Sequence, residues 1–190
     1  MDLEEQRYGR NKNTLVDKTY IDSGEYRRKF DKISDNIEVV RSVYILAKTA
    51  LKHRSGTELE DMYWVDGDTG KIVAQEIDAL NNRAIVYSNN TRQIIKESSD
   101  NLIALHTHPN SMPPSAADFN SCYRNQYRLG IVVCHNGKVF VYTSDEEMNE
   151  RIYNTYIFLA VSKGMSEYDA QIDTLNRMKK FLKIDFWEVN

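Results

Sequence analysis

The spacing of apolar and polar positions divides the first third of the chain into one helix and one hairpin. Apolar residues recur every three or four positions between residues 37 and 51, which predicts an amphipathic helix. We expect this helix to be capped within residues 34–36 and to end near His53, before the Ser-Gly break. Residues 59–65 and 71–77 surround the short segment DGDTG, so they predict two strands joined by a tight turn.

The middle of the chain alternates between polar and apolar segments. Residues 78–90 are polar and rich in asparagine, which predicts a loop. A short helix, about Thr91–Glu97, should follow, with Asn89-Asn90 as its cap. LIALHTH, residues 102–108, is apolar until its histidines and predicts a central strand whose end reaches solvent. After a proline-rich loop, a helix is predicted to start at Ser115.

The last third predicts a second hairpin and two helices. LGIVVCH and KVFVYT surround Asn136-Gly137, a dipeptide that strongly favours a tight hairpin turn. Helical segments are expected at about 145–163 and 166–183, separated by Gly164, with Ser166 as the second cap. The order of these elements predicts an α/β fold in which a mixed sheet is flanked by helices.

Composition narrows the class of protein. The chain has 190 residues, of which 41% are hydrophobic and 28% charged, as in an ordinary soluble domain. The net charge of −3 argues against a broad nucleic-acid surface. We see no apolar run long enough for a membrane span, and the polar N-terminus is no signal peptide. Two cysteines, Cys122 and Cys134, are expected to be free thiols, which favours the cytoplasm.

The domain organisation expected from these patterns has three parts. Residues 1–33 are polar at their start and are expected to form a partly flexible arm. Residues 34–143 hold the predicted hairpins and the histidine-bearing strand, and form the core. Residues 144–190 form a C-terminal helical extension. The arm and the extension are the segments through which a partner protein would dock.

The segment HTHPNSMPPSAAD concentrates most of the unusual chemistry of the chain. Residues two apart on a strand point to the same face, so His106 and His108 present two imidazoles side by side. Asp118 lies in the first turn of the predicted helix and can supply a third ligand if the proline loop doubles back. Two histidines and one carboxylate, with a fourth position left for water, form a recurring catalytic zinc site.

The same residues also have a purely structural interpretation. Ser115 and Asp118 have the spacing of a helix cap, in which serine caps the helix and an acid favours its N-terminus. The two prolines before Ser115 would then only keep the chain extended. The two interpretations are compatible, because one turn can start the helix and direct Ser115 at a metal.

His-x-His-Pro followed by Ser-x-x-Asp resembles the JAMM motif of the JAB/MPN metalloprotease superfamily. The resemblance implies cytidine-deaminase-like layering and one Zn²⁺ per chain, held by His106, His108 and Asp118. It also implies that Ser115 stabilises the oxyanion during hydrolysis of a peptide or isopeptide bond. The implied partner is a protein or peptide substrate, with ubiquitin-like modifiers among the candidates.

The match covers roughly residues 36–143 and departs from the common motif at one point. Six residues, rather than seven, separate His108 from Ser115, which predicts a tighter loop. The first hairpin is more similar to bacterial RadC-like and phage-associated JAB domains than to the eukaryotic enzymes. A metal-binding or catalytically silent JAB/MPN interaction module, associated with phage, mobile elements or DNA repair, is the alternative function.

The general base is expected among the acids that flank the first hairpin. Glu58 and Glu60 would share one strand face, so periodicity alone does not separate them. Glu58 stands where the helix gives way to the strand, and it lies eight residues before Asp66. The resemblance to RadC-like relatives favours that spacing. We therefore expect Glu58 to be the base, with Glu60 as the alternative.

Overall fold

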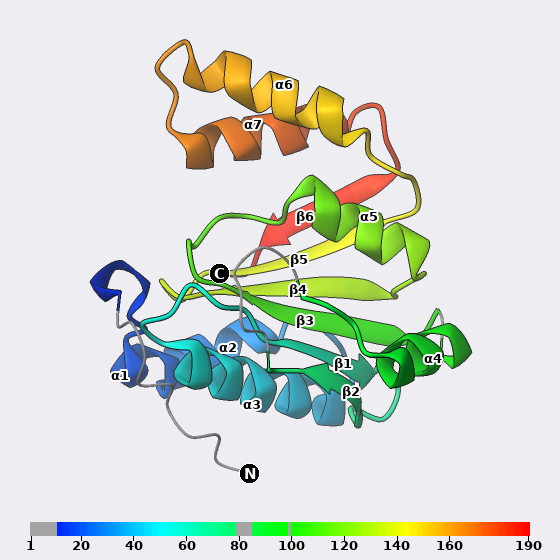
Figure 1. The fold of residues 1–190 in the computed structure, drawn as a ribbon. Helices are drawn as coiled ribbons and strands as arrows, with labels where there is room; N and C mark the ends of the chain where they lie inside the picture. The colour runs from blue at the N-terminus through cyan, green and yellow to red at the C-terminus, as the bar shows by residue number, and fades with distance from the viewer. Residues whose placement is uncertain (1–10, 79–84, 99) are drawn as a thin grey trace.

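The computed structural model describes residues 11–78, 85–98 and 100–190. Within them the chain forms seven α-helices, one short 3-10 helix and six strands (Figure 1). In chain order the elements are η1 (Lys12–Thr14), α1 (Lys18–Ile21), α2 (Gly24–Phe30), α3 (Ile37–Arg54), β1 (Met62–Asp66), β2 (Ile72–Glu76), α4 (Asn89–Glu97), β3 (Leu102–His108), α5 (Ala116–Arg124), β4 (Leu129–Cys134), β5 (Val139–Ser144), α6 (Glu150–Val161), α7 (Glu167–Met178) and β6 (Ile184–Glu188). None of the described helices is long and apolar enough to cross a membrane.

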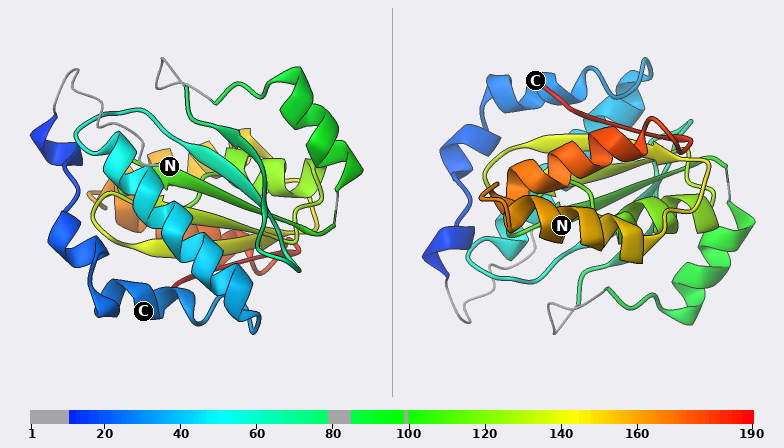
Figure 2. Two further views of the ribbon diagram at one scale, coloured as in Figure 1. Left: turned by 90° about the horizontal axis from the view of Figure 1, so that it is seen from below. Right: turned by 90° about the horizontal axis from the view of Figure 1, so that it is seen from above.

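All six strands belong to one mixed, open sheet with the order β2-β1-β3-β4-β5-β6. β3 and β4 run parallel, whereas every other neighbouring pair is antiparallel. The helices α1 to α3 lie against one face, and α5 to α7 lie on the other (Figures 1 and 2). This arrangement confirms the α/β class and the mixed sheet flanked by helices.

Each face of the sheet is covered by its own hydrophobic core. On one face Ile103 and Leu105 of β3 join a cluster that includes Phe30 and Leu51 of the N-terminal helices. On the other face Leu102 and Ala104 of β3 join a cluster with Phe119, Tyr142 and Leu175. Because both faces are covered, every residue of β3 is buried, including its two histidines. β3 is thus a central strand between β1 and β4, and the polar side chains at its end are buried.

Most of the predicted elements are confirmed, with shifted ends. The helix over residues 37–54, both hairpins and the strand at 102–108 form where the sequence predicts them. Ser115 and Ser166 are the caps of α5 and α7. The cap of α4 is Ser88, not Asn89-Asn90, because the Ser88 hydroxyl accepts the Thr91 N–H at 3.2 Å. Residues 79–84 of the predicted loop lie outside the described residues.

The two ends of the chain contain structure that the sequence did not predict. In the segment expected as an arm, α2 buries Tyr26 and Phe30, and Phe30 makes an edge-on contact with Tyr44 of α3. Residues 1–10 lie outside the described residues. The C-terminal segment ends in β6, which pairs with β5 and buries Ile184 and Phe186. The C-terminal extension therefore supplies an edge strand as well as two helices.

Candidate metal centre

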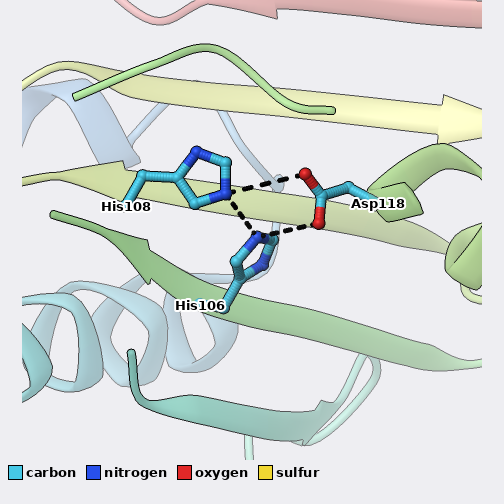
Figure 3. A group of neighbouring side chains, drawn as sticks. All are labelled: His106, His108 and Asp118. Atoms are coloured by element: carbon cyan, nitrogen blue, oxygen red, sulfur yellow. Dashed lines mark hydrogen bonds and ion pairs between the residues drawn. The ribbon is translucent and has the colours of Figure 1, made fainter. Parts of the chain in front are cut away.

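The end of β3 presents two histidines to the same side of the sheet. His106 and His108 are 4% and 8% exposed, and their Nε2 atoms are 3.0 Å apart (Figure 3). Thr107, between them, is fully buried on the opposite side. This confirms the expected alternation along the strand, which directs both imidazoles toward α5.

Helix α5 brings Asp118 to these histidines. Ser115 caps the helix, and Asp118 occupies its third position in a reciprocal capping box. The Asp118 carboxylate lies 3.2 Å from His106 Nε2 through Oδ1 and 3.6 Å from His108 Nε2 through Oδ2. The proline loop therefore does double back, as the metal-site interpretation required.

The spacing of these atoms suits a small divalent ion. One ligand atom from each of His106, His108 and Asp118 lies within 4.8 Å of the other two. A tetrahedral zinc site with bonds of about 2 Å has ligand atoms about 3.3 Å apart. The Nε2 atoms of the two histidines are 3.0 Å apart and Asp118 Oδ1 lies 3.2 Å from His106 Nε2, both close to that value. The donor set and its spacing therefore fit zinc with three protein ligands.

The hydrogen bonds around the group orient it for binding. His108 Nδ1 lies 2.9 Å from the Met112 carbonyl, which only accepts, so Nδ1 carries the proton and Nε2 keeps its lone pair. His106 Nδ1 makes no hydrogen bond within the part of the chain that the structure describes. Asp118 Oδ2 accepts from the Ser115 N–H at 2.6 Å and from the Ser115 hydroxyl at 2.8 Å. This holds the carboxylate in place and leaves Oδ1 toward His106.

Asp118 is held in its charged form. Burial acts to raise the pKa of Asp118, but the neighbouring His106 and His108 and the Ser115 N–H outweigh it and lower that pKa below its usual range. A charged carboxylate is the form that binds a cation. Asp118 is thus ionised near neutral pH and needs no deprotonation of its own to act as a ligand, whereas a protonated histidine would release its proton on binding a metal.

A cavity of about 400 Å³ opens over the three residues. Its wall combines polar groups with the apolar side chains Met62, Ile85, Tyr87 and Met112. Gln171 and Glu167 of α7 complete it from the C-terminal extension. The sequence carries no local signal for these contributions from residues 85–87 and from α7, because they depend on how distant segments pack.

The structure places Glu60, not Glu58, in this cavity. Glu58 is exposed, and its Oε1 accepts a hydrogen bond of 3.2 Å from Asn11 Nδ2. The reason is register: Met62 pairs with His106, so two residues earlier Glu60 lies beside His108. Both glutamates precede β1, and Glu58 lies past the end of β3. The geometry therefore favours Glu60, the alternative, over Glu58 as the acid beside the metal group.

The environment of Glu60 suits a group that exchanges protons. Burial raises the pKa of Glu60 to about 7, partly offset by His108 and reinforced by the charge of Asp118. A carboxyl group with a pKa near neutrality can both take up and release a proton. Glu60 is thus the acid in the cavity whose protonation state is most easily changed near neutral pH.

The other two histidines do not join the group. His53 lies in the last turn of α3, as predicted, where its Nδ1 lies 2.6 Å from the Asp61 carboxylate. His135 follows β4, and its Nδ1 lies 2.6 Å from the Thr14 carbonyl. Among the described residues, only His106, His108 and Asp118 form a cluster that could hold a metal ion.

Comparison of the chain with protein-family models, with curated proteins and with solved structures finds no match.

Proposed function

We propose that this protein is a zinc-dependent hydrolase of peptide or isopeptide bonds, with a site of JAMM type. The observation that carries the proposal is the convergence of His106, His108 and Asp118 beneath a cavity that also holds Glu60. Two histidines and one carboxylate as ligands, with a proton-exchanging acid nearby, are a recurring set for metal-assisted hydrolysis.

Each part of the site has a place in that chemistry. His106, His108 and Asp118 would hold Zn²⁺, which when bound polarises a carbonyl group and makes water a nucleophile at neutral pH. Glu60 takes the proton from the attacking water at its carboxylate and hands it to the departing amine. The apolar walls formed by Met62, Tyr87 and Tyr142 limit the access of other water to the reacting groups.

Membership of the JAB/MPN superfamily, with its cytidine-deaminase-like layering, is part of the proposal. It is supported because the quoted motif residues meet in space despite the shortened loop. The described residues that line the cavity include Glu60, Asp118 and Glu167 but no lysine or arginine. That charge suits a protein or peptide substrate, ubiquitin-like modifiers included, better than a nucleic acid. The cytoplasm is the proposed location. It is supported because Cys122 and Cys134 are free and buried thiols, which suit a reducing compartment.

The proposal predicts about one zinc ion per purified chain. A chelator should remove the ion, lower the melting temperature and abolish hydrolysis, and added zinc should restore all three. Elemental analysis and thermal unfolding measure this without a known substrate, and screens of peptide and ubiquitin-like fusions then measure hydrolysis. If the purified protein holds no stoichiometric divalent ion and zinc titration finds no tight site, the proposal of a zinc-dependent hydrolase is refuted.

Ser115 can be tested against a control, because Ser166 caps α7 in a similar way with Asp169 three residues later, and neither of these two residues lines the cavity. Both Ser115→Ala and Ser166→Ala should cost about 1 kcal/mol of stability as lost caps. Only Ser115→Ala should also weaken zinc binding, by about 10- to 100-fold, because it removes a hydrogen bond to a ligand carboxylate. Competition with a chromophoric chelator measures this affinity.

The role of Ser115 in oxyanion stabilisation stays a separate prediction. The Ser115 hydroxyl already donates to Asp118, so it would have to turn away from Asp118 to serve an oxyanion. If Ser115→Ala keeps full zinc affinity but lowers turnover by about 10²-fold, the oxyanion role is favoured over the ligand-holding role.

A second candidate function, a partner-binding module, has support from one observation. Helix α6 exposes Phe158, Ile152 and Leu159, and Phe158 is 71% exposed. Large apolar side chains gathered on one exposed helix are typical of an interaction surface. Metal content separates the enzyme from a silent module that lacks zinc, and hydrolysis separates it from a module that binds metal without catalysis. A chain that binds no zinc, yet loses self-association or partner binding in Phe158→Ser, would favour the module.

A further inference from the structure

The residue between the two metal-site histidines contacts the segment that carries Glu60. Thr107 is fully buried on the face of the sheet opposite to the cavity. Its hydroxyl accepts the Asp61 N–H at 3.0 Å, and its own N–H donates to the Asp61 carbonyl at 3.1 Å. Asp61 is therefore bound to β3 by both of its backbone groups, at the position between the two histidines.

Asp61 is also held by its side chain. Its carboxylate lies 2.6 Å from His53 Nδ1 and accepts from Arg54 Nε, both in the last turn of α3. Asp61 and Arg54 are fully buried, and Arg54 also donates to the Ile77 carbonyl. A buried ion pair of this kind is weak evidence for added stability, because the charges lose their hydration. Its value lies more in the defined position that it imposes on Asp61.

Glu60 depends on this anchor for its own position. Glu60 and Asp61 precede β1, whose regular pairing with β3 extends only from Met62 onward. Neighbouring residues of an extended chain point to opposite faces, so the anchoring of Asp61 toward α3 directs Glu60 toward His108. The carboxylate of Glu60 is thus placed by contacts on the far side of the sheet.

We propose that Thr107, acting through Asp61, is a positioning residue that sets Glu60 relative to the metal ligands. One residue can do this because Thr107 belongs to the strand that carries both histidines and also binds the segment that carries the acid. The inference rests on the proposed function, in which Glu60 accepts a proton from water at the metal. A displacement of about 1 Å at such a group is enough to lower a rate by about 10²-fold.

Thr107→Val tests the inference, since valine keeps the shape of threonine and removes only the hydroxyl that accepts the Asp61 N–H. Thr107→Ser keeps the hydroxyl and should behave as the native protein. Thr174→Val, at a buried threonine of α7 that does not line the cavity, controls for the loss of a buried hydroxyl. His53→Leu loosens Asp61 through its side chain and serves if Thr107→Val does not fold.

The probe is Co²⁺ bound to the whole 190-residue chain. The visible absorption of the bound cobalt reports the groups around the metal without a substrate. Glu60→Gln provides the reference spectrum for a site that lacks the carboxylate. We expect Thr107→Val and His53→Leu to bind one cobalt ion and to shift toward that reference. Thr107→Ser and Thr174→Val should keep the native spectrum.

The outcomes separate this inference from the function on which it rests. If Glu60→Gln changes the spectrum while Thr107→Val and His53→Leu keep the native one, the inference is wrong and the metal centre stands. If Glu60→Gln leaves the spectrum unchanged, Glu60 does not act at the metal, and the inference is wrong with it. If the native protein takes up no cobalt, the proposed metal centre and this inference both fail.

Discussion

Glu60→Gln is expected to retain zinc and fold while losing hydrolysis by about 10²- to 10⁴-fold. The amide has nearly the shape of the carboxylate but cannot accept the proton of the attacking water. Glu60 is the acid that lines the cavity beside His108, and burial raises its pKa to about 7. Zinc content, melting temperature and turnover of the same preparation are the measurements.

Glu58→Gln is the matched control for this prediction. Glu58 lies two residues earlier, outside the cavity, where its carboxylate accepts a hydrogen bond from Asn11. Its amide variant should keep both zinc and turnover. A dead Glu58→Gln beside an active Glu60→Gln would show that the register of the segment before β1 differs in the working enzyme. The preference for Glu58 expected from the sequence would then be restored.

Asp118→Asn is expected to lose stoichiometric zinc, which is the second large effect. The substitution keeps the size of the side chain but replaces the one negatively charged ligand with a neutral amide. The native protein should gain about 4 kcal/mol of stability when free zinc exceeds its dissociation constant a thousandfold. The variant should show almost none of that gain in thermal unfolding followed with and without zinc.

Helix α7 again supplies the control. Asp169 holds the same third position in α7 that Asp118 holds in α5, and the Ser166 hydroxyl donates to it at 2.7 Å. Asp169→Asn should therefore reproduce the effect on the cap and leave zinc binding intact. Equal zinc loss in both variants would mean that the metal response reflects general destabilisation, and the assignment of Asp118 as a ligand would be withdrawn.

The sequence by itself determined the helices and strands between residues 37 and 144 and most of the candidate metal group, because the information is local. Strand alternation places His106 and His108 on one face, and a serine followed three residues later by an acid places Asp118 in a capping box. Turn and cap residues act over four or five positions, so α3, both hairpins and α5 appear near their predicted positions. The direction of a side chain within one strand or one helical turn depends on the residues of that element alone, so it can be predicted without the rest of the fold.

Only the tertiary structure decided which acid accompanies the metal group. Glu58 and Glu60 are two residues apart and would share one strand face, so periodicity cannot separate them. The choice depends on the pairing of Met62 with His106. The convergence of Asp118 on the histidines, the burial of α2, the addition of β6 to the sheet and the wall that α7 gives the cavity are of the same kind. Each depends on contacts between segments far apart in the chain. The free energy of such contacts comes from the fit of whole surfaces, which no short stretch of sequence specifies.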